Sequence, residues 1–250
     1  MTTVERIRSF DGQELAVHRV GEGRPVILLH GLFSNAKTNW IKFGHAQRIA
    51  DAGFAAIMPD LRAHGESATP HEAAAYPGGV LVKDVKALVE ALGLTEFDLV
   101  GFSLGARTAA AAVIDGLRPR KLVLAGMGLE GVAGWNRRAD FFIDAIDRCD
   151  EVRHGDPAFL AASFMKTMKI DRVAARFLLQ AVTDIDADDL ARLDMPTAVI
   201  SGDQDADNGS PQALVNALPN ARYIEVPGTH MSSVTLPDLG EAITAFLSEA

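Results

Sequence analysis

The chain has 250 residues, of which 48% are hydrophobic, and this is enough for one sizeable core. We therefore expect residues 1–250 to form a single domain. The 24 lysines and arginines stand against 33 aspartates and glutamates, which gives a formal net charge of -9, and no basic run is interleaved with aromatic residues. Nucleic acid is therefore not an expected partner.

The N-terminus and the cysteine content favour a cytoplasmic protein. Residues 1–10 alternate charged and apolar side chains, whereas a signal peptide has a basic head and then an apolar run. No run of about 18 apolar residues is present, so a membrane is not an expected partner. Cys149 is the only cysteine, which excludes an intramolecular disulfide and a cysteine-based metal cluster and fits a reducing compartment. We expect a monomer or a homodimer.

The predicted elements begin with an antiparallel hairpin. Residues 4–10 and 14–20 alternate in the manner of strands, and Asp11-Gly12 between them is a strong turn signal. Short apolar runs that suit strands buried on both faces then recur at 26–29, 55–58, 97–102, 121–125, 197–201 and 223–226. Such runs are typical of the interior of a parallel sheet.

Segments with helical spacing lie between these strands, at 40–52, 80–92, 104–115, 212–218 and 238–248. The alternation of strand and helix predicts an α/β fold with a mostly parallel twisted sheet and helices on both faces. One interval breaks this alternation. From about 129 to 190 the sequence is helix-like throughout, which predicts a helical lid insertion after the strand that ends near Ala125.

The strongest local signal is the pentapeptide Gly101-Phe102-Ser103-Leu104-Gly105. It follows an apolar strand and opens an alanine-rich helix, which is the context that a G-x-S-x-G nucleophile elbow requires. A serine on such a sharp turn needs glycine neighbours, because strand and helix pass close beside it. An alternative reading makes Ser103 only the cap of the helix.

Three further segments follow predicted strands. They carry the other groups that a nucleophilic serine needs. His30-Gly31-Leu32 follows the earliest buried strand, and the backbone N–H of Leu32 could pair with that of Leu104 to form an oxyanion hole. Asp203, Asp205 and Asp207 follow the strand at 197–201, and His230 follows the last strand. The order serine, acid, histidine predicts a triad with Ser103 as nucleophile and His230 as general base.

On these motifs the whole chain resembles the α/β-hydrolase superfamily, in particular its small bacterial esterase-like members with a helical lid. Residues 59–67 look like the family's D-x-R-G-x-G-x-S loop, with Ala63 in place of the usual glycine. The resemblance implies that Asp60 and Arg62 organise loops, and Asp84 on the following helix is also expected to be structural. The family's G-x-x-D motif matches residues 202–205, which favours Asp205 as the acid of the triad.

The expected chemistry is acyl transfer from a small or medium uncharged carboxylic ester, with no metal or organic cofactor. Aromatic and methionine side chains predict a largely apolar substrate pocket. The side chains expected to line it are Phe33, Trp40, Met127 and Trp135.

Other reactions fit the same residues. Carbon–carbon bond hydrolysis, lactone opening and a perhydrolase activity use the same triad, although the residues after the His30-Gly31 pair favour esters modestly. A haloalkane dehalogenase is disfavoured, because that branch needs an aspartate at the position of Ser103. A non-enzymatic small-molecule receptor and an interfacial lipase are further alternatives, the lipase being less favoured because the chain is acidic.

Overall fold

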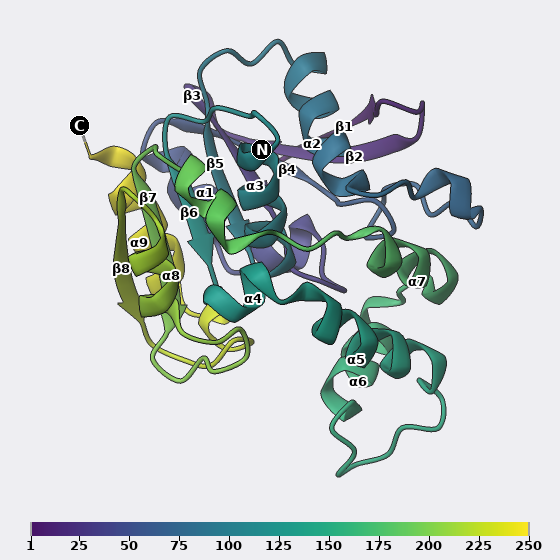
Figure 1. Ribbon diagram of the computed structural model, residues 1–250. Coiled ribbons are helices and arrows are strands. Elements are labelled where there is room, and N and C mark those ends of the chain that lie inside the picture. Colours follow the sequence, from purple (N-terminus) through teal and green to yellow (C-terminus); the bar gives the residue numbers. More distant parts are fainter. Residues whose placement is uncertain (1, 250) are drawn as a thin grey trace.

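A single eight-stranded sheet forms the centre of the computed structural model, which describes residues 2–249 (Figure 1). Its strands are β1 (Thr3–Arg8), β2 (Glu14–Val20), β3 (Arg24–Leu29), β4 (Phe54–Pro59), β5 (Asp98–Phe102), β6 (Leu122–Ala125), β7 (Thr197–Gly202) and β8 (Ala221–Val226). Their order across the sheet is β1-β2-β4-β3-β5-β6-β7-β8. β2 pairs antiparallel with both β1 and β4, and β3 to β8 are parallel to one another. The predicted hairpin and parallel sheet are confirmed.

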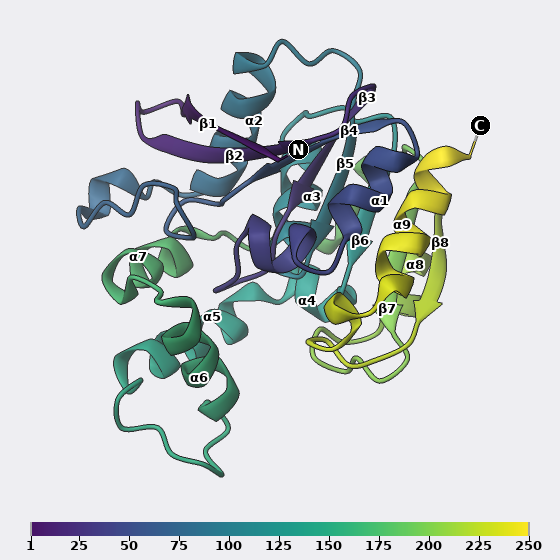
Figure 2. The same cartoon turned by 180° about the vertical axis from the view of Figure 1, so that it is seen from behind.

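Helices cover both faces of the sheet (Figures 1 and 2). One face carries α2 (Val80–Ala91), α3 (Leu104–Ile114) and α8 (Pro211–Ala217), and the other carries α1 (His45–Asp51) and α9 (Pro237–Ser248). Each face has its own apolar cluster, because successive side chains of a strand point to opposite sides.

Strand β3 shows why the central strands read as continuous apolar runs. Ile27 and Leu29 belong to the cluster under α2 and α3, whereas Val26 and Leu28 belong to the cluster under α1 and α9. All four side chains are fully buried. A strand covered on both faces therefore shows no polar alternation.

One predicted helix is wrong. The segment 40–52 is divided into a π-helical turn at Lys37–Ile41 and the short helix α1. Gly44 separates them with a φ of 81°, in the left-handed region that a right-handed helix does not contain. The ends of the other predicted strands and helices outside the insertion lie within two residues of the observed ends.

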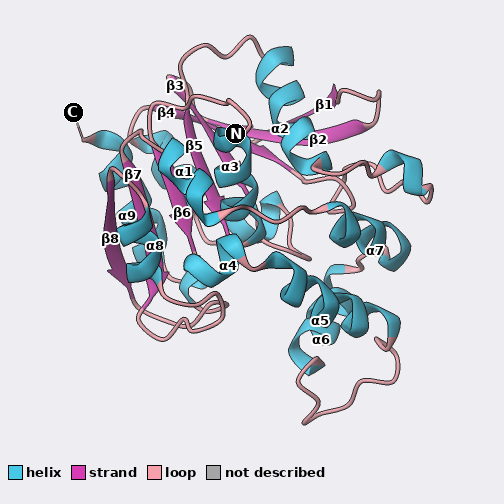
Figure 3. Cartoon of the chain, viewed as in Figure 1, coloured by secondary structure: helices cyan, strands magenta, loops and turns pink. Residues whose placement is uncertain are grey.

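The interval between β6 and β7 is helical, as predicted, and its middle part projects away from the strand-rich part of the molecule (Figure 3). We call it the helical insertion, and it contains α4 (Leu129–Ala133), α5 (Trp135–Asp147), α6 (Phe159–Met168), α7 (Arg172–Ala181) and a 3-10 helix at Ala187–Arg192. Asp171 caps α7 by accepting the N–H groups of Val173 and Ala174. Among the residues from 2 to 249, no helix is both long and apolar enough to cross a bilayer.

The loop at 59–67 is fixed by a buried arginine. The guanidinium of Arg62 binds the carboxylate of Asp84 on α2 at 2.6 Å and that of Asp11 in the hairpin turn at 2.6 Å. The pKa of Arg62 is raised above its usual value, because these hydrogen bonds and opposite charges outweigh the burial that alone would lower it. Ala63, at the position of the expected glycine, adopts a φ of 66°. The loop-organising role predicted for Arg62 and the structural role predicted for Asp84 are consistent with these contacts.

Candidate active site

Ser103 lies on a strained turn between β5 and α3. Its φ of 53° and ψ of -116° are unusual for a residue with a side chain. A Cβ on Gly101 would lie 2.3 Å from the backbone of Gly105, and a Cβ on Gly105 would lie 2.1 Å from the carbonyl oxygen of Leu29. Both glycines are therefore required by the close passage of strand and helix, as the elbow motif predicts.

Three side chains from distant parts of the chain form a hydrogen-bonded series. Ser103 Oγ lies 3.0 Å from His230 Nε2, and His230 Nδ1 lies 2.8 Å from Asp205 Oδ2. The side chains of His230 and Asp205 are only 11% and 2% exposed. Ser103 makes no side-chain capping bond to α3, so its hydroxyl is directed to the imidazole and the cap-only alternative does not hold.

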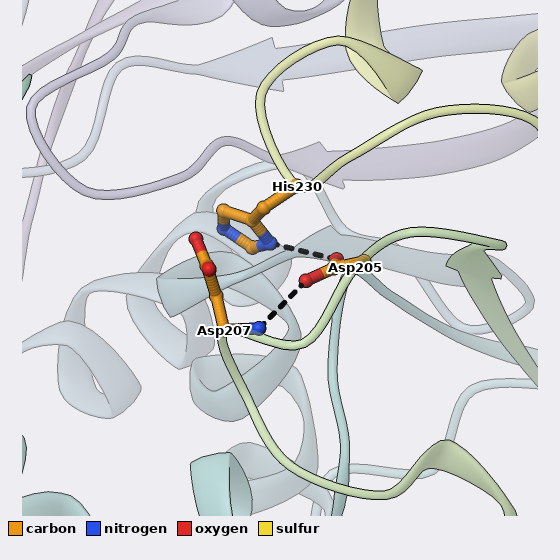
Figure 4. A group of neighbouring side chains, drawn as sticks. All are labelled: Asp205, Asp207 and His230. Carbon is orange, nitrogen blue, oxygen red and sulfur yellow. Dashed lines mark hydrogen bonds and ion pairs between the residues drawn. The ribbon is translucent and has the colours of Figure 1, made fainter.

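The loop after β7, residues 203–210, selects among three aspartates, and we call it the acid loop. Asp203 Oδ1 accepts the N–H of Gly228 at 2.7 Å, which fastens the histidine loop instead of touching the imidazole. Only Asp205 bonds His230, while the backbone N–H of Asp207 donates to Asp205 Oδ1 at 3.1 Å and orients it (Figure 4). The structure therefore separates the roles of residues that the sequence placed together.

Side-chain ligand atoms of Asp205, Asp207 and His230 lie within 4.8 Å of one another, a spacing that a metal ion could use. Both imidazole nitrogens of His230 are already engaged, one by Asp205 and one by Ser103. Asp207 alone of the three keeps a free carboxylate. The arrangement suits proton transfer better than metal ligation.

Two backbone N–H groups beside Ser103 are available for an oxyanion. Leu104 is the first residue of α3, where the N–H has no partner within the helix. The N–H groups on either side of Leu32 are occupied, because Gly31 donates to Asn39 Oδ1 at 3.0 Å and Phe33 donates to His64 Nε2 at 3.0 Å. Within the described chain no acceptor bonds the N–H of Leu32 or Leu104. This supports the two donors predicted from the sequence.

Two buried histidines hold the loop that carries Leu32. His64 Nδ1 donates to the carbonyl of Arg62 at 3.0 Å, so its Nε2 is free to accept from Phe33. His30 Nε2 accepts the N–H of Leu61 at 2.9 Å. Burial lowers the pKa of His30, and burial together with the neighbouring His30 lowers the pKa of His64 to about 3. Both rings are therefore neutral at pH 7 and act as acceptors.

A pocket opens beside Ser103 between the sheet and the helical insertion. It is lined by Leu32, Ser103, Leu104, Arg107, Met127, Gly131, Trp135, Arg138, Phe142 and Asn208, and it contains about 270 Å³ of empty space including its open mouth. Met127 and Trp135 line the pocket, as the sequence predicts, together with both proposed oxyanion donors. The site thus combines a serine, a histidine hydrogen-bonded to it and a pocket beside the serine.

The profile of the α/β-hydrolase fold family matches residues 24–143. Over 241 residues the chain is 24% identical to pyrrolizixenacetamide deacetylase of Xenorhabdus hominickii, which covers 87% of this chain and 88% of that protein. The enol-lactonase of Burkholderia xenovorans LB400 superposes with a TM-score of 0.76 at 21% identity, covering 98% of this chain and 100% of the other. The chain has the α/β-hydrolase fold.

Some other proteins are similar in sequence to this chain over shorter stretches. An epoxide hydrolase of Caballeronia sordidicola is 35% identical over 109 residues, which is 44% of this chain and 32% of that protein. The names of the similar proteins state different reactions, so the shared fold does not define the reaction of this chain. The choice of reaction depends on the site.

Two side chains predicted for the pocket lie elsewhere. Trp40 is fully buried in the cluster on the α1 and α9 face of the sheet, where its ring packs near His45. Phe33 is 2% exposed and its ring centroid lies 5.8 Å from that of Phe142, so it supports a wall of the pocket from behind. Both residues follow Leu32 closely in the sequence, which led to the prediction that they line the pocket. Their side chains are instead buried outside it.

Sequence reasoning missed Arg107, Arg138 and Asn208 in the pocket. Arg107 follows Ser103 by one helical turn, and its N–H bonds the Ser103 carbonyl, so helical spacing could have placed it beside the nucleophile. Arg138 and Asn208 reach the pocket from α5 and the acid loop. These two come together only through tertiary packing, for which the sequence carries no local signal.

The helical insertion is bonded directly to the acid loop. Leu129 donates its N–H to the carbonyl of Ser210 at 3.1 Å, and Gly131 donates to that of Asn208 at 2.9 Å. Glu130 accepts the N–H of Ser210 at 2.8 Å. The guanidinium of Arg138 also donates to the carbonyl of Asp207. The start of the insertion and the loop that carries Asp205 therefore form one bonded unit.

Proposed function

We propose that this protein is a serine esterase that cleaves small carboxylic esters through an acyl-enzyme on Ser103. The observation that carries the proposal is the series from Ser103 through His230 to Asp205, with contacts of 3.0 and 2.8 Å, beside two free N–H groups. Nucleophile, base, orienting carboxylate and oxyanion donors are the groups that acyl transfer requires.

Acylation begins when His230 Nε2 takes the proton of Ser103 as Oγ attacks the ester carbonyl. The N–H groups of Leu32 and Leu104 stabilise the negative oxygen of the tetrahedral intermediate. Asp205 accepts the hydrogen bond from Nδ1, which fixes the tautomer and stabilises the imidazolium. The imidazolium then gives its proton to the departing alkoxide, and the acyl group stays on Ser103.

Deacylation repeats the same steps with water as the nucleophile. His230 takes a proton from water, the hydroxide adds to the acyl carbonyl, and the second tetrahedral intermediate collapses with return of the proton to Ser103. The products are a carboxylic acid and the regenerated enzyme. Every proton in this sequence passes through His230, so no cofactor is needed in the proposed cycle.

The size of the pocket supports a small substrate. The cavity itself measures only about 20 Å³, well below the range typical of small-molecule sites, so it leaves no room for a long acyl chain. One relative that matches most of the chain is named a deacetylase, which is consistent with transfer of a short acyl group. The sequence also predicted an uncharged, apolar substrate, but two arginines line the pocket, so we retain the ester and its size only.

The test is hydrolysis of p-nitrophenyl acetate, butyrate and octanoate by the wild type and by Ser103→Ala. We expect the wild type to be most active on the short esters and the variant to lose at least about 10³-fold in kcat. A fluorophosphonate probe should label the wild type and not the variant. No turnover of any ester by a folded wild type would refute the esterase.

Assays with the same purified protein distinguish the alternative reactions. Carbon–carbon hydrolysis and lactone opening use the same groups, so activity on those substrates with inert p-nitrophenyl esters would favour them. Labelling of Ser103 without turnover on any substrate would favour a small-molecule receptor. The single domain, the cytoplasmic location and the monomeric or dimeric state expected from the sequence stay predictions.

A further inference from the structure

Two arginines in the pocket lack full compensation of their charge. Arg107 and Arg138 both line it beside Ser103. The side chain of Arg107 is only 3% exposed, and its Nε is buried with no hydrogen-bond partner within the described chain. Burying a guanidinium without its partners is costly. The wall of the pocket therefore contains a guanidinium group whose donors the described residues do not all satisfy.

The protein partners of Arg107 are weak ones for a buried cation. One terminal nitrogen donates to the carbonyl of Thr183, and the nearest carboxylate, that of Asp184, lies 3.9 Å away and is 40% exposed. Asp184 is also hydrogen-bonded by Asn136. Burial lowers the pKa of Arg107 to about 10, so the guanidinium is still charged at pH 7. Its positive charge is therefore available to a ligand.

Arg138, which lies on α5, also lacks a close carboxylate partner among the described residues. It donates to the backbone carbonyl of Asp207, and no carboxylate of the described residues lies within 4 Å of its guanidinium. The nearby acids are Asp205, which is bonded to His230, and Asp207, whose side chain is exposed to solvent. A carbonyl satisfies a donor but does not neutralise a charge.

Both guanidinium groups are held over aromatic rings of α5. The central carbon of Arg107 lies 5.3 Å from the ring centroid of Trp135, and that of Arg138 lies 5.7 Å from the ring centroid of Phe142. Stacking restricts a long side chain and leaves the edge of the guanidinium open to hydrogen bonding. Two ordered cations therefore border a pocket that the composition of the insertion had suggested to be apolar.

From this geometry we infer that the pocket binds the carboxylate of an anionic ester, with Arg107 and Arg138 as the specificity-determining residues. The inference rests on the proposed ester hydrolysis at Ser103. Two guanidinium groups suit a carboxylate, which accepts two or more hydrogen bonds, better than a neutral acyl chain. The substrate class is a half-ester of a short dicarboxylic acid, or an ester whose alcohol portion carries the carboxylate.

Two matched pairs of esters test both orientations. Monoethyl glutarate and diethyl glutarate differ by a carboxylate on the acyl portion, and 4-acetoxybenzoate and its methyl ester differ by one on the leaving group. We expect the wild type to prefer the anionic member of one pair. Arg107→Gln and Arg138→Gln should each lower the ratio of kcat/KM for the anionic ester to kcat/KM for its neutral partner by at least about tenfold.

A control variant is available, and a purely structural role of the two arginines predicts a different result. Arg48→Gln removes a partly exposed arginine of α1 that pairs with Glu241, away from the pocket, and should change the activity on neither ester. If Arg107 and Arg138 only support the insertion, their variants will lose activity on the neutral and anionic esters equally. That result, or a preference of the wild type for the neutral member of both pairs, would overturn the inference.

A binding measurement separates this inference from the esterase proposal. Trp135 lies under Arg107 and is one of two tryptophans in the chain, so its fluorescence should respond to an occupied pocket. Glutarate should change the emission of the wild type, glutaramide should not, and both arginine variants should lose the response. Binding of glutarate without ester turnover would refute only the esterase; ester turnover with neither anion binding nor anion preference would refute only the carboxylate site.

Discussion

Asp205 is one of three aspartates within five residues, and its role depends on one contact with His230 Nδ1 at 2.8 Å. Asp205→Asn keeps the size of the side chain but replaces the charged acceptor that holds the imidazole in its reactive tautomer. We expect kcat for p-nitrophenyl acetate to fall by about 10³-fold to 10⁴-fold. Steady-state kinetics with the purified variant measures this directly.

Asp203→Asn is the matched control. Asp203 accepts the N–H of Gly228 through Oδ1, and the amide oxygen of asparagine can accept the same bond. We expect a change in kcat of less than about threefold. Equal losses at positions 203 and 205 would mean that the loop tolerates no substitution and that the assignment of Asp205 is unsupported.

At the scale of elements, the position of Ser103 depends on how closely α3 packs against β3. A Cβ on Gly105 would lie 2.1 Å from the carbonyl oxygen of Leu29 and 2.5 Å from its carbon, and backbone atoms cannot move aside as a side chain can. We expect Gly105→Ala to lower the free energy of unfolding by about 3 kcal/mol or more, measured by urea denaturation.

Gly78→Ala provides the comparison for this substitution. Its nearest non-neighbour atom is the Thr183 methyl group at 3.7 Å, an ordinary contact, and its φ lies outside the left-handed region. A change within about 0.5 kcal/mol is expected there. Similar losses at Gly78 and Gly105 would show that a generic cost of adding a methyl group, not the close approach of α3 to β3, is responsible.

Elements were predicted best where burial on both faces leaves a continuous apolar run. β3 and β5 are such strands, and the G-x-S-x-G motif at the end of β5 fixed the start of α3 as well. The segment around Trp40 was not predicted correctly, because the helical spacing of its apolar residues continues across Gly44 although the backbone reverses its φ there. Local periodicity does not register a single left-handed residue.

Across the whole molecule, the candidate site was predictable to the extent that its residues lie at strand ends. Parallel strands bring their carboxyl ends to one edge, so Ser103, Asp205 and His230 could be associated without knowledge of distances. Arg107 and Arg138 could not be associated in this way, because the helical insertion meets the sheet through packing that no motif encodes. The charge of the pocket was missed for the same reason.

The two buried histidines that hold the loop of Leu32 make the stability of the whole protein depend on pH. The pKa of His64 is lowered to about 3, whereas an unfolded histidine titrates near 6.5. The unfolded state therefore binds the additional proton, and this stability is complete above pH 6.5 and is lost as pH falls toward 3. We expect His64 alone to remove about 2 kcal/mol of unfolding free energy between pH 7.5 and pH 5.

Urea denaturation of the wild type and of His64→Gln at several pH values isolates this effect. Glutamine can accept from Phe33 and does not titrate, so its stability should depend less steeply on pH. Asp84, whose pKa is raised by burial, acts in the opposite direction at low pH, but it is present in both proteins and cancels in the difference. Parallel curves for the two proteins would rule out His64 as the source.

The bonds between the helical insertion and the acid loop limit how this enzyme can be rebuilt. Leu129, Gly131 and Arg138 all donate to carbonyls of residues 207–210, on the same loop as Asp205. Grafting a foreign insertion onto this sheet would replace the Arg138 side chain, and the two backbone bonds would form only where the new backbone follows the same path. The insertion and the acid loop must therefore be exchanged together. A change of the insertion that alters the pocket also alters the position of Asp205.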